Sequence, residues 1–101
     1  MATIRVVVNF RVRAGREPDL LEAGKTVKKL LDSLGVTLFI VRQVAGPETG
    51  NIIAVQQYSD WTHFAKVQSD REIAQFVERM RQDTNPPWES FTVSISEEVA
   101  L

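Results

Sequence analysis

One histidine, one tyrosine and a few arginines are the side chains through which this sequence could do chemistry. His63 is the only histidine among 101 residues, and a neutral imidazole can accept or donate a proton for a bound ligand. Arg11 and Arg42 interrupt strand-like segments, where a guanidinium must find an acid, an anion or water. We therefore predict His63 and Arg11 as catalytic residues. Arg42 is predicted to bind an acidic or enolate-like substrate.

Aromatic rings that can hold a flat substrate lie close to the histidine in sequence. Tyr58 and Trp61 flank the start of a predicted helix, where they could stack on an aromatic molecule. The tyrosine hydroxyl or the indole N–H would then orient a polar group of the substrate. Asn9 shares a strand face with Arg11. These three residues complete the predicted substrate-binding set.

Each of these residues also has a purely structural explanation, which the sequence leaves open. His63 could be a partly exposed histidine on a helix surface, and the aromatic rings could pack in the core or at its rim. The arginines could be exposed at strand ends, or could pair between subunits with nearby acids: Glu17, Asp19, Glu97 and Glu98.

Composition excludes several classes of function. The chain has no cysteine, which removes disulfides, iron-sulfur clusters, thiolate zinc sites and cysteine nucleophiles. With a single histidine, no residue spacing indicates a metal site, and we expect neither a metal nor a cofactor. A net charge of -1 favours no nucleic-acid partner. The longest apolar run, residues 38–41, is far too short to span a membrane, so we expect a cytoplasmic protein.

Two predicted strands carry apolar side chains on both faces. In residues 3–13 one face is continuously apolar and the other still carries Val7, and in residues 51–58 both faces are apolar. The helices of one chain of this length can cover one face of a small sheet. We therefore expect the second face to pack against another copy of the chain, giving a homodimer.

Helical spacing and turn residues predict the other elements. The acidic, proline-containing turn at residues 16–19 begins a helix that ends at Gly35, a typical position for a left-handed cap. Gly24 lies in the apolar stripe of this helix, which indicates a close approach to the sheet or a tolerated defect. The remaining expectations, in chain order, are a strand at 36–44, a helix from Trp61 interrupted at 69–70, a second helical stretch reaching Met80, and a strand at 91–95.

The order of these elements defines the fold class. Strand, helix, strand, strand, split helix, strand is the α+β, ferredoxin-like plan with a four-stranded antiparallel sheet. We expect residues 1–101 to form a single domain of this kind.

The stretch from Val12 to Glu17, Val-Arg-Ala-Gly-Arg-Glu, resembles the opening turn of the dimeric alpha/beta-barrel superfamily. Residues 58–61 and 68–70 are similar to the same families, which include the antibiotic-biosynthesis monooxygenases and the NIPSNAP group. The resemblance covers nearly the whole chain and implies a dimeric alpha/beta barrel. It further implies a small cofactor-independent monooxygenase acting on an aromatic or quinol-type molecule. The alternative that it implies is a non-catalytic ligand-binding or stress-related NIPSNAP-like domain.

The chain departs from these families at several positions. Many monooxygenase-like members carry two histidines around the serine that resembles Ser69, where this chain has Lys66 and Arg71. The heme-degrading relatives have an asparagine where this chain has Val8 and a histidine where it has Phe76, so we do not expect heme degradation. In a monooxygenase of the resembled kind, oxygen would attack the substrate carbanion directly.

Overall fold

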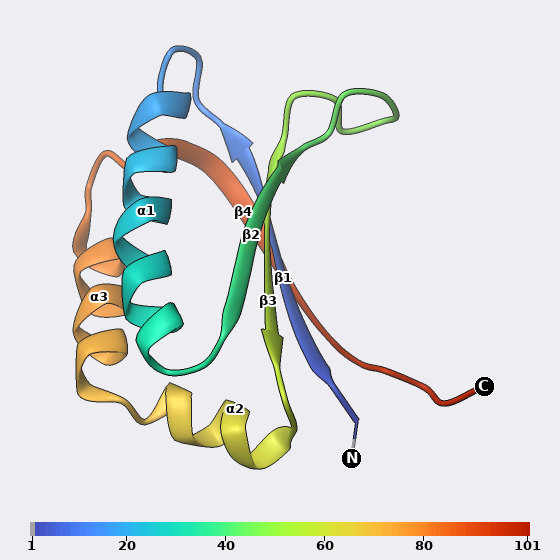
Figure 1. The fold of residues 1–101 in the computed structure, drawn as a ribbon. Helices are drawn as coiled ribbons and strands as arrows, with labels where there is room; N and C mark the ends of the chain where they lie inside the picture. The colour runs from blue at the N-terminus through green and yellow to red at the C-terminus, as the bar shows by residue number, and fades with distance from the viewer. Residues whose placement is uncertain (1) are drawn as a thin grey trace.

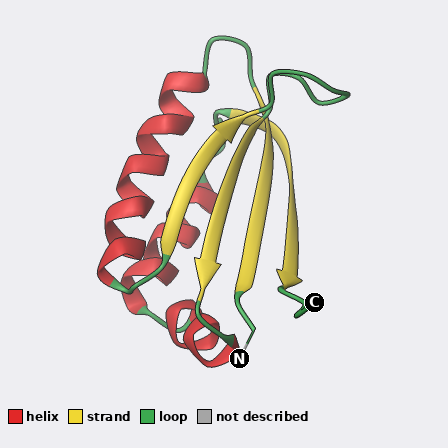
Figure 2. Cartoon of the chain, turned by 45° about the vertical axis from the view of Figure 1, so that its right-hand side comes forward, coloured by secondary structure: helices red, strands yellow, loops and turns green. Residues whose placement is uncertain are grey.

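A four-stranded antiparallel sheet with helices on one face makes up the structure, a computed structural model that describes residues 2–101 (Figure 1). The elements follow in the order β1 (Ile4–Val12), α1 (Glu17–Ser33), β2 (Thr37–Arg42), β3 (Ile52–Tyr58), α2 (Trp61–Gln68), α3 (Arg71–Gln82) and β4 (Trp88–Glu97). The strands lie side by side in the order β2-β3-β1-β4, as Figure 2 shows. This arrangement confirms the ferredoxin-like α+β prediction.

The strands differ from their predicted bounds mainly at the edges of the sheet. β2 ends at Arg42 rather than at position 44, because Gln43 begins the loop that returns to β3. β4 starts at Trp88, three residues before the predicted strand, because its first residues continue the pairing with β1: Val12 pairs with Trp88. A register shift between Arg11 and Val12 accommodates this longer pairing.

The two faces of the sheet have different surroundings. Ile4, Val6 and Val8 of β1 point toward the helices and join the core, whereas the intervening Val7 points to the other face. Val7 pairs with Val55 of β3, and Val55 pairs in turn with Phe39 of β2, so apolar side chains adjoin on that second face. Among the described residues all helices lie on the first face, and the second face has no cover (Figures 1 and 2).

Side-chain caps explain where the two short helices begin. Asp60 accepts a hydrogen bond from the backbone N–H of His63 at 2.8 Å, and Trp61 is the first residue of α2. Asp70 accepts from the N–H groups of Glu72 and Ile73 and caps α3 in the same way. The predicted interruption between the two helical stretches is therefore a second cap.

Two glycines, one within α1 and one just after it, have the conformation and contacts that their positions predict. Gly35 has a φ of +76° just after the helix, which is the left-handed conformation expected of a C-terminal cap. A Cβ on Gly24 would lie 2.7 Å from Cδ1 of Ile40 in β2, closer than side chains normally approach. α1 therefore approaches the sheet closely at Gly24, and the predicted close approach is confirmed.

The core lies between the sheet and the helices and is centred on β1 and β3. Its members include Ile4, Leu31, Val36, Tyr58 and Val67, each exposed by 2% or less. Within residues 2–101, no helix is long and apolar enough to cross a membrane.

Candidate functional site

A cavity of about 650 Å³ lies between the helices and the inner face of the sheet. Its volume falls in the range of small-molecule sites, and its walls are mainly apolar. The sheet contributes alternate residues of all four strands, which is what the side-chain period of two requires. The helices contribute their apolar stripes, chiefly from α1 and α3, including Leu20, Gly24, Val27, Ile73, Phe76, Val77 and Met80.

Polar groups gather at one end of this cavity. Tyr58 is 1% exposed, and its hydroxyl donates a hydrogen bond to Oε1 of Gln56 at 2.6 Å. Gln68, at the end of α2, also lines the cavity, and its side-chain amide is a polar neighbour that lowers the pKa of the phenol. The Tyr58 ring is held in place edge to face against Phe64, with centroids 5.1 Å apart. One hydroxyl and two amides therefore line one part of a largely apolar cavity.

Burial raises the pKa of the Tyr58 phenol above its ordinary value of 10.0, and the hydrogen bond with the Gln68 side chain opposes part of that rise. The hydroxyl therefore stays protonated throughout the neutral and mildly alkaline range. In that state it donates its single hydrogen to Gln56, and a substrate oxygen would receive that hydrogen by taking the place of the glutamine oxygen. It does not act as a base.

The chain has a single tyrosine, so the absorbance of phenolate reports Tyr58 alone. We expect the folded protein to form phenolate only above pH 10, and the urea-unfolded chain to do so near the ordinary value. Because the folded pKa is raised, the stability that this group contributes is complete below about pH 10 and is lost as the pH rises through the folded pKa. A folded protein that titrates like the unfolded chain would contradict the burial described above.

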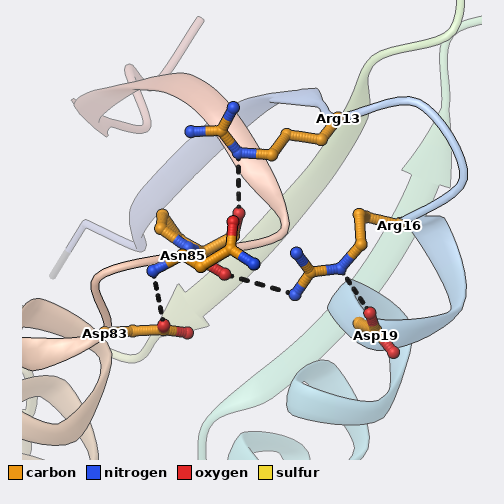
Figure 3. Close-up of polar contacts among 6 residues, drawn as sticks. Arg13, Arg16, Asp19, Asp83 and Asn85 are labelled. Carbon is orange, nitrogen blue, oxygen red and sulfur yellow. Dashed lines mark hydrogen bonds and ion pairs between the residues drawn. The ribbon is translucent and has the colours of Figure 1, made fainter.

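Two arginines hold the loop before β4 against the turn before α1 (Figure 3), and part of this loop lines the cavity. Nε of Arg13 donates to the carbonyl of Pro86 at 2.9 Å, and the guanidinium of Arg16 donates to the carbonyl of Asn85 at 3.3 Å. Asp19 holds the Arg16 guanidinium from the other side at 2.5 Å. The turn before α1 is thereby tied to the loop before β4, and Pro86 of that loop lines the cavity.

His63 lies outside the cavity, where both of its ring nitrogens meet backbone groups. Nδ1 accepts from the N–H of Ser59 at 3.0 Å, so Nε2 carries the hydrogen and donates to the carbonyl of Leu34 at 2.8 Å. The imidazole joins the start of α2 to the end of α1. Both nitrogens are hydrogen-bonded to the backbone in this structure, and a role of His63 in proton transfer stays a prediction.

Arg11 and Asn9 lie on the outer face of the sheet, on the far side from the cavity. Arg11 is exposed and pairs with Glu89 at 3.1 Å. Asn9 donates to Glu48 at 2.6 Å and accepts from Asn51 at 2.9 Å. Both line a separate polar hollow of about 410 Å³ under the loop between β2 and β3.

Arg42 and Trp61 each form a hydrogen bond with a glutamate outside the cavity. The guanidinium of Arg42 donates to Oε1 of Glu17 at 2.8 Å, which ties the end of β2 to the start of α1. Trp61 is half exposed on α2 and donates from its indole nitrogen to Glu97 at 2.7 Å. Of the six residues predicted for the site, only Tyr58 lines the main cavity.

The two glutamines beside Tyr58 are the site residues that sequence reasoning does not assign. Gln56 interrupts an otherwise apolar strand face, and this polar residue at a core position was the available signal. Gln68 carries no comparable signal, because a glutamine at a helix end is usually solvated.

Comparisons with known proteins support the fold. No protein-family description matches the chain, and no curated protein matches its sequence. Among solved structures, the chain is similar to a dabb family protein with a ferredoxin-like fold from Mesorhizobium loti, at a TM-score of 0.75 and 19% identity, covering 99% of this chain and 100% of that one. A NIPSNAP family protein from Agrobacterium tumefaciens matches at a TM-score of 0.67 and 17% identity, covering 96% and 86%.

A third similar structure is SnoaB, a cofactor-independent oxygenase from Streptomyces nogalater, here as a mutant form. It matches at a TM-score of 0.67 and 11% identity, covering 97% of this chain and 92% of that one. At these identities the three likenesses show a common ferredoxin-like fold. They confirm the fold that the resemblance implies.

Proposed function

We propose that this chain is a small cofactor-independent monooxygenase that binds a flat, hydroxylated aromatic or quinol-type molecule in the cavity between sheet and helices. The observation that carries this proposal is the convergence of Tyr58, Gln56 and Gln68 on one end of a largely apolar cavity. An apolar space with a few convergent polar groups is the usual form of a small-molecule site. The likeness to a cofactor-independent oxygenase adds support at the level of fold.

Tyr58 would hold the oxygen of the substrate as it becomes an anion. A neutral phenol that turns its hydrogen from Gln56 to the substrate would donate a strong hydrogen bond to a developing oxyanion, and the two amides can rotate to complete its shell. The other ionisable residues that line the cavity among residues 2–101 are Arg81 and Asp83, which lie toward the opposite end. A substrate acidic enough to lose its proton without a strong base suits this arrangement.

The substrate itself would supply the electrons for the reaction. A methylene carbon flanked by aromatic rings loses two hydrogens and gains one oxygen atom from O2 as a carbonyl, and the second oxygen atom leaves as water. The apolar walls around the ring would place few proton donors beside the carbanion.

The test is incubation with a panel of hydroxylated polycyclic aromatics. Product formation is measured with and without O2, and oxygen uptake is followed in the aerobic samples. We expect O2-dependent product formation, and we expect Tyr58→Phe to lower kcat/KM about 100-fold, as loss of one oxyanion donor does elsewhere. Thr92→Val is the matched control, because it removes one hydroxyl from the outer face of the sheet. Normal turnover in Tyr58→Phe would contradict the role given to the phenol.

The alternative is a non-catalytic, NIPSNAP-like ligand-binding domain. It is favoured by the engagement of both His63 nitrogens with the backbone, which leaves no imidazole near the cavity to act as a base. The same panel distinguishes the two functions. Saturable binding of a phenol without oxygen uptake would support the binding domain.

We also propose that the chain forms a homodimer through the outer face of the sheet. This face carries a contiguous apolar patch and has no cover within residues 2–101 (Figure 2). Two of its members, Phe39 and Val41, are 44% and 43% exposed. A bare sheet face of this kind is typical of a surface that another subunit covers. The patch consists of Val7, Phe39, Val41, Ile53 and Val55.

A further inference from the structure

One side of the cavity is an open groove between α3 and β4. Phe91, Val93 and Ile95 lie on the helix-facing side of β4, in register with Phe10, Val8 and Val6 of the core strand, yet they are 51%, 53% and 51% exposed. Val77 of α3, which also lines the cavity, is 46% exposed. The helices therefore cover β1 and β3 but leave the inner side of β4 uncovered.

We infer that this groove holds the alkyl tail of a single-headed amphiphile, a hydroxylated ring that carries an apolar chain. The inference rests on the proposed function, because the ring would occupy the polar end of the cavity at Tyr58. To the proposed function the inference adds the chemical class of the ring's substituent, an alkyl chain, and the surface that binds this chain. We define the α3–β4 groove by four residues, Val77, Phe91, Val93 and Ile95.

Continuity with the polar end is the first argument for this occupant. The groove and the Tyr58 end belong to one cavity, and Ile95 pairs with the same core residue, Val6, that pairs with Gln56. A molecule whose ring reaches Tyr58 is thus directed into the groove at its other end. A volume of about 650 Å³ leaves room beyond a compact ring system.

The placement of charge indicates that the ligand has one polar head. The two charged residues that line the cavity, Arg81 and Asp83, are already engaged: Arg81 lies 3.6 Å from Glu78, and Asp83 accepts from the N–H of Asn85 at 2.9 Å. Between them and Tyr58 the groove offers apolar side chains. A chain of methylene groups matches such a wall, and a second polar group would lose its hydration there.

The length of the groove suits a chain of several carbons. From Ile95 to Phe91 the strand spans about 14 Å at the usual rise per residue. The groove ends at a cluster of three rings, in which the centroids of Phe10 and Trp88 are 5.4 Å apart and those of Phe10 and Phe91 are 5.9 Å apart. These rings form an apolar stop for the end of the tail.

The chain's own C-terminal residues do not fill the groove. The backbone N–H of Glu98 donates to the carbonyl of Thr3 at 2.9 Å, which holds the start of the tail beside the residue that precedes β1. From there the chain runs away from the helices (Figure 1). Val99 and Leu101 at its end are strongly exposed.

The test is the affinity for para-alkylphenols from methyl to octyl, read from Trp88 fluorescence in a Trp61→Phe background. With two tryptophans in the chain, this background leaves Trp88 as the only reporter, and it lies in the cavity. We expect the affinity to rise about threefold for each added methylene until the groove is full. Val93→Thr with Ile95→Thr keeps β-branched shapes and should flatten this dependence, while the affinity for methylphenol stays within about twofold.

Val99→Thr is the matched control, because it makes the same kind of change outside the groove and should keep the full dependence on chain length. Binding of methylphenol without any gain from longer chains would overturn the inference and leave the proposed function standing. The inference would also be overturned if the Val93→Thr, Ile95→Thr variant gained as much affinity per added methylene as the wild type. If no phenol binds at all, the proposed function fails as well. A change of oligomeric mass in the groove variant would show that a protein contact occupies the groove and would overturn the inference.

Discussion

Replacing Val55 by glutamate is expected to leave an 11.4 kDa monomer in place of a dimer of twice that mass. Val55 is the centre of the outer apolar patch, since it pairs with Val7 on one side and with Phe39 on the other. A carboxylate there would be buried against the partner without a counter-ion, and desolvation of an unpaired charge costs several kcal/mol. We expect dimer affinity to fall at least about 100-fold, as measured by sedimentation velocity.

Gln57→Glu is the control for this experiment. It adds the same charge on the same face of the same strand, two residues beyond Val55 and outside the apolar patch. We expect it to remain a dimer. Because the cavity lies on the opposite face of the sheet, the Val55 variant should keep its ligand affinity. A wild-type chain that sediments as a monomer at micromolar concentration would refute the homodimer.

Local sequence determines much of the fold. The alternation in β1 fixes which residues face the helices, because one residue of shift would turn Val7 and Val8 to the wrong faces. Asp60 and Asp70 start helices through their own side chains, and Gly35 ends one through its own backbone. Such signals act over a few residues. They can therefore be recognised in the sequence without knowledge of the tertiary structure.

The site was less predictable because it depends on where helices lie over the sheet. His63 has the right type for catalysis, but its direction follows from the packing of α2 against the end of α1, which brings Leu34 to its Nε2. Arg11 lies on the outer face by the same alternation that turns Val8 toward the helices. The incomplete cover of β4 depends on the position of α3, which no pattern within β4 reveals. Gln56 was visible as a polar residue in an apolar face, and Tyr58 was predicted for the site, although no sequence pattern paired the two.

A structural histidine and a catalytic one respond differently to removal, and His63→Ala separates them. The variant loses two hydrogen bonds, to Ser59 and Leu34, and the edge contact of the imidazole with the Tyr58 ring at 5.6 Å. Unsatisfied backbone groups and lost contacts of this kind cost about 2 kcal/mol. For a chain of this length we expect the melting temperature to fall by about 10 °C, measured at a fixed protein concentration.

Ligand affinity and turnover at a temperature where His63→Ala is folded should stay close to those of the wild type, because the imidazole does not line the cavity. Lys66→Ala, at an exposed position on the same helix, controls for effects on α2 and should leave the melting temperature within a few degrees. Arg11→Ala should likewise leave turnover unchanged, since its side chain points to the outer face. An unchanged melting temperature together with lost turnover in His63→Ala would reverse this assignment and return the histidine to the chemistry that the sequence first indicated.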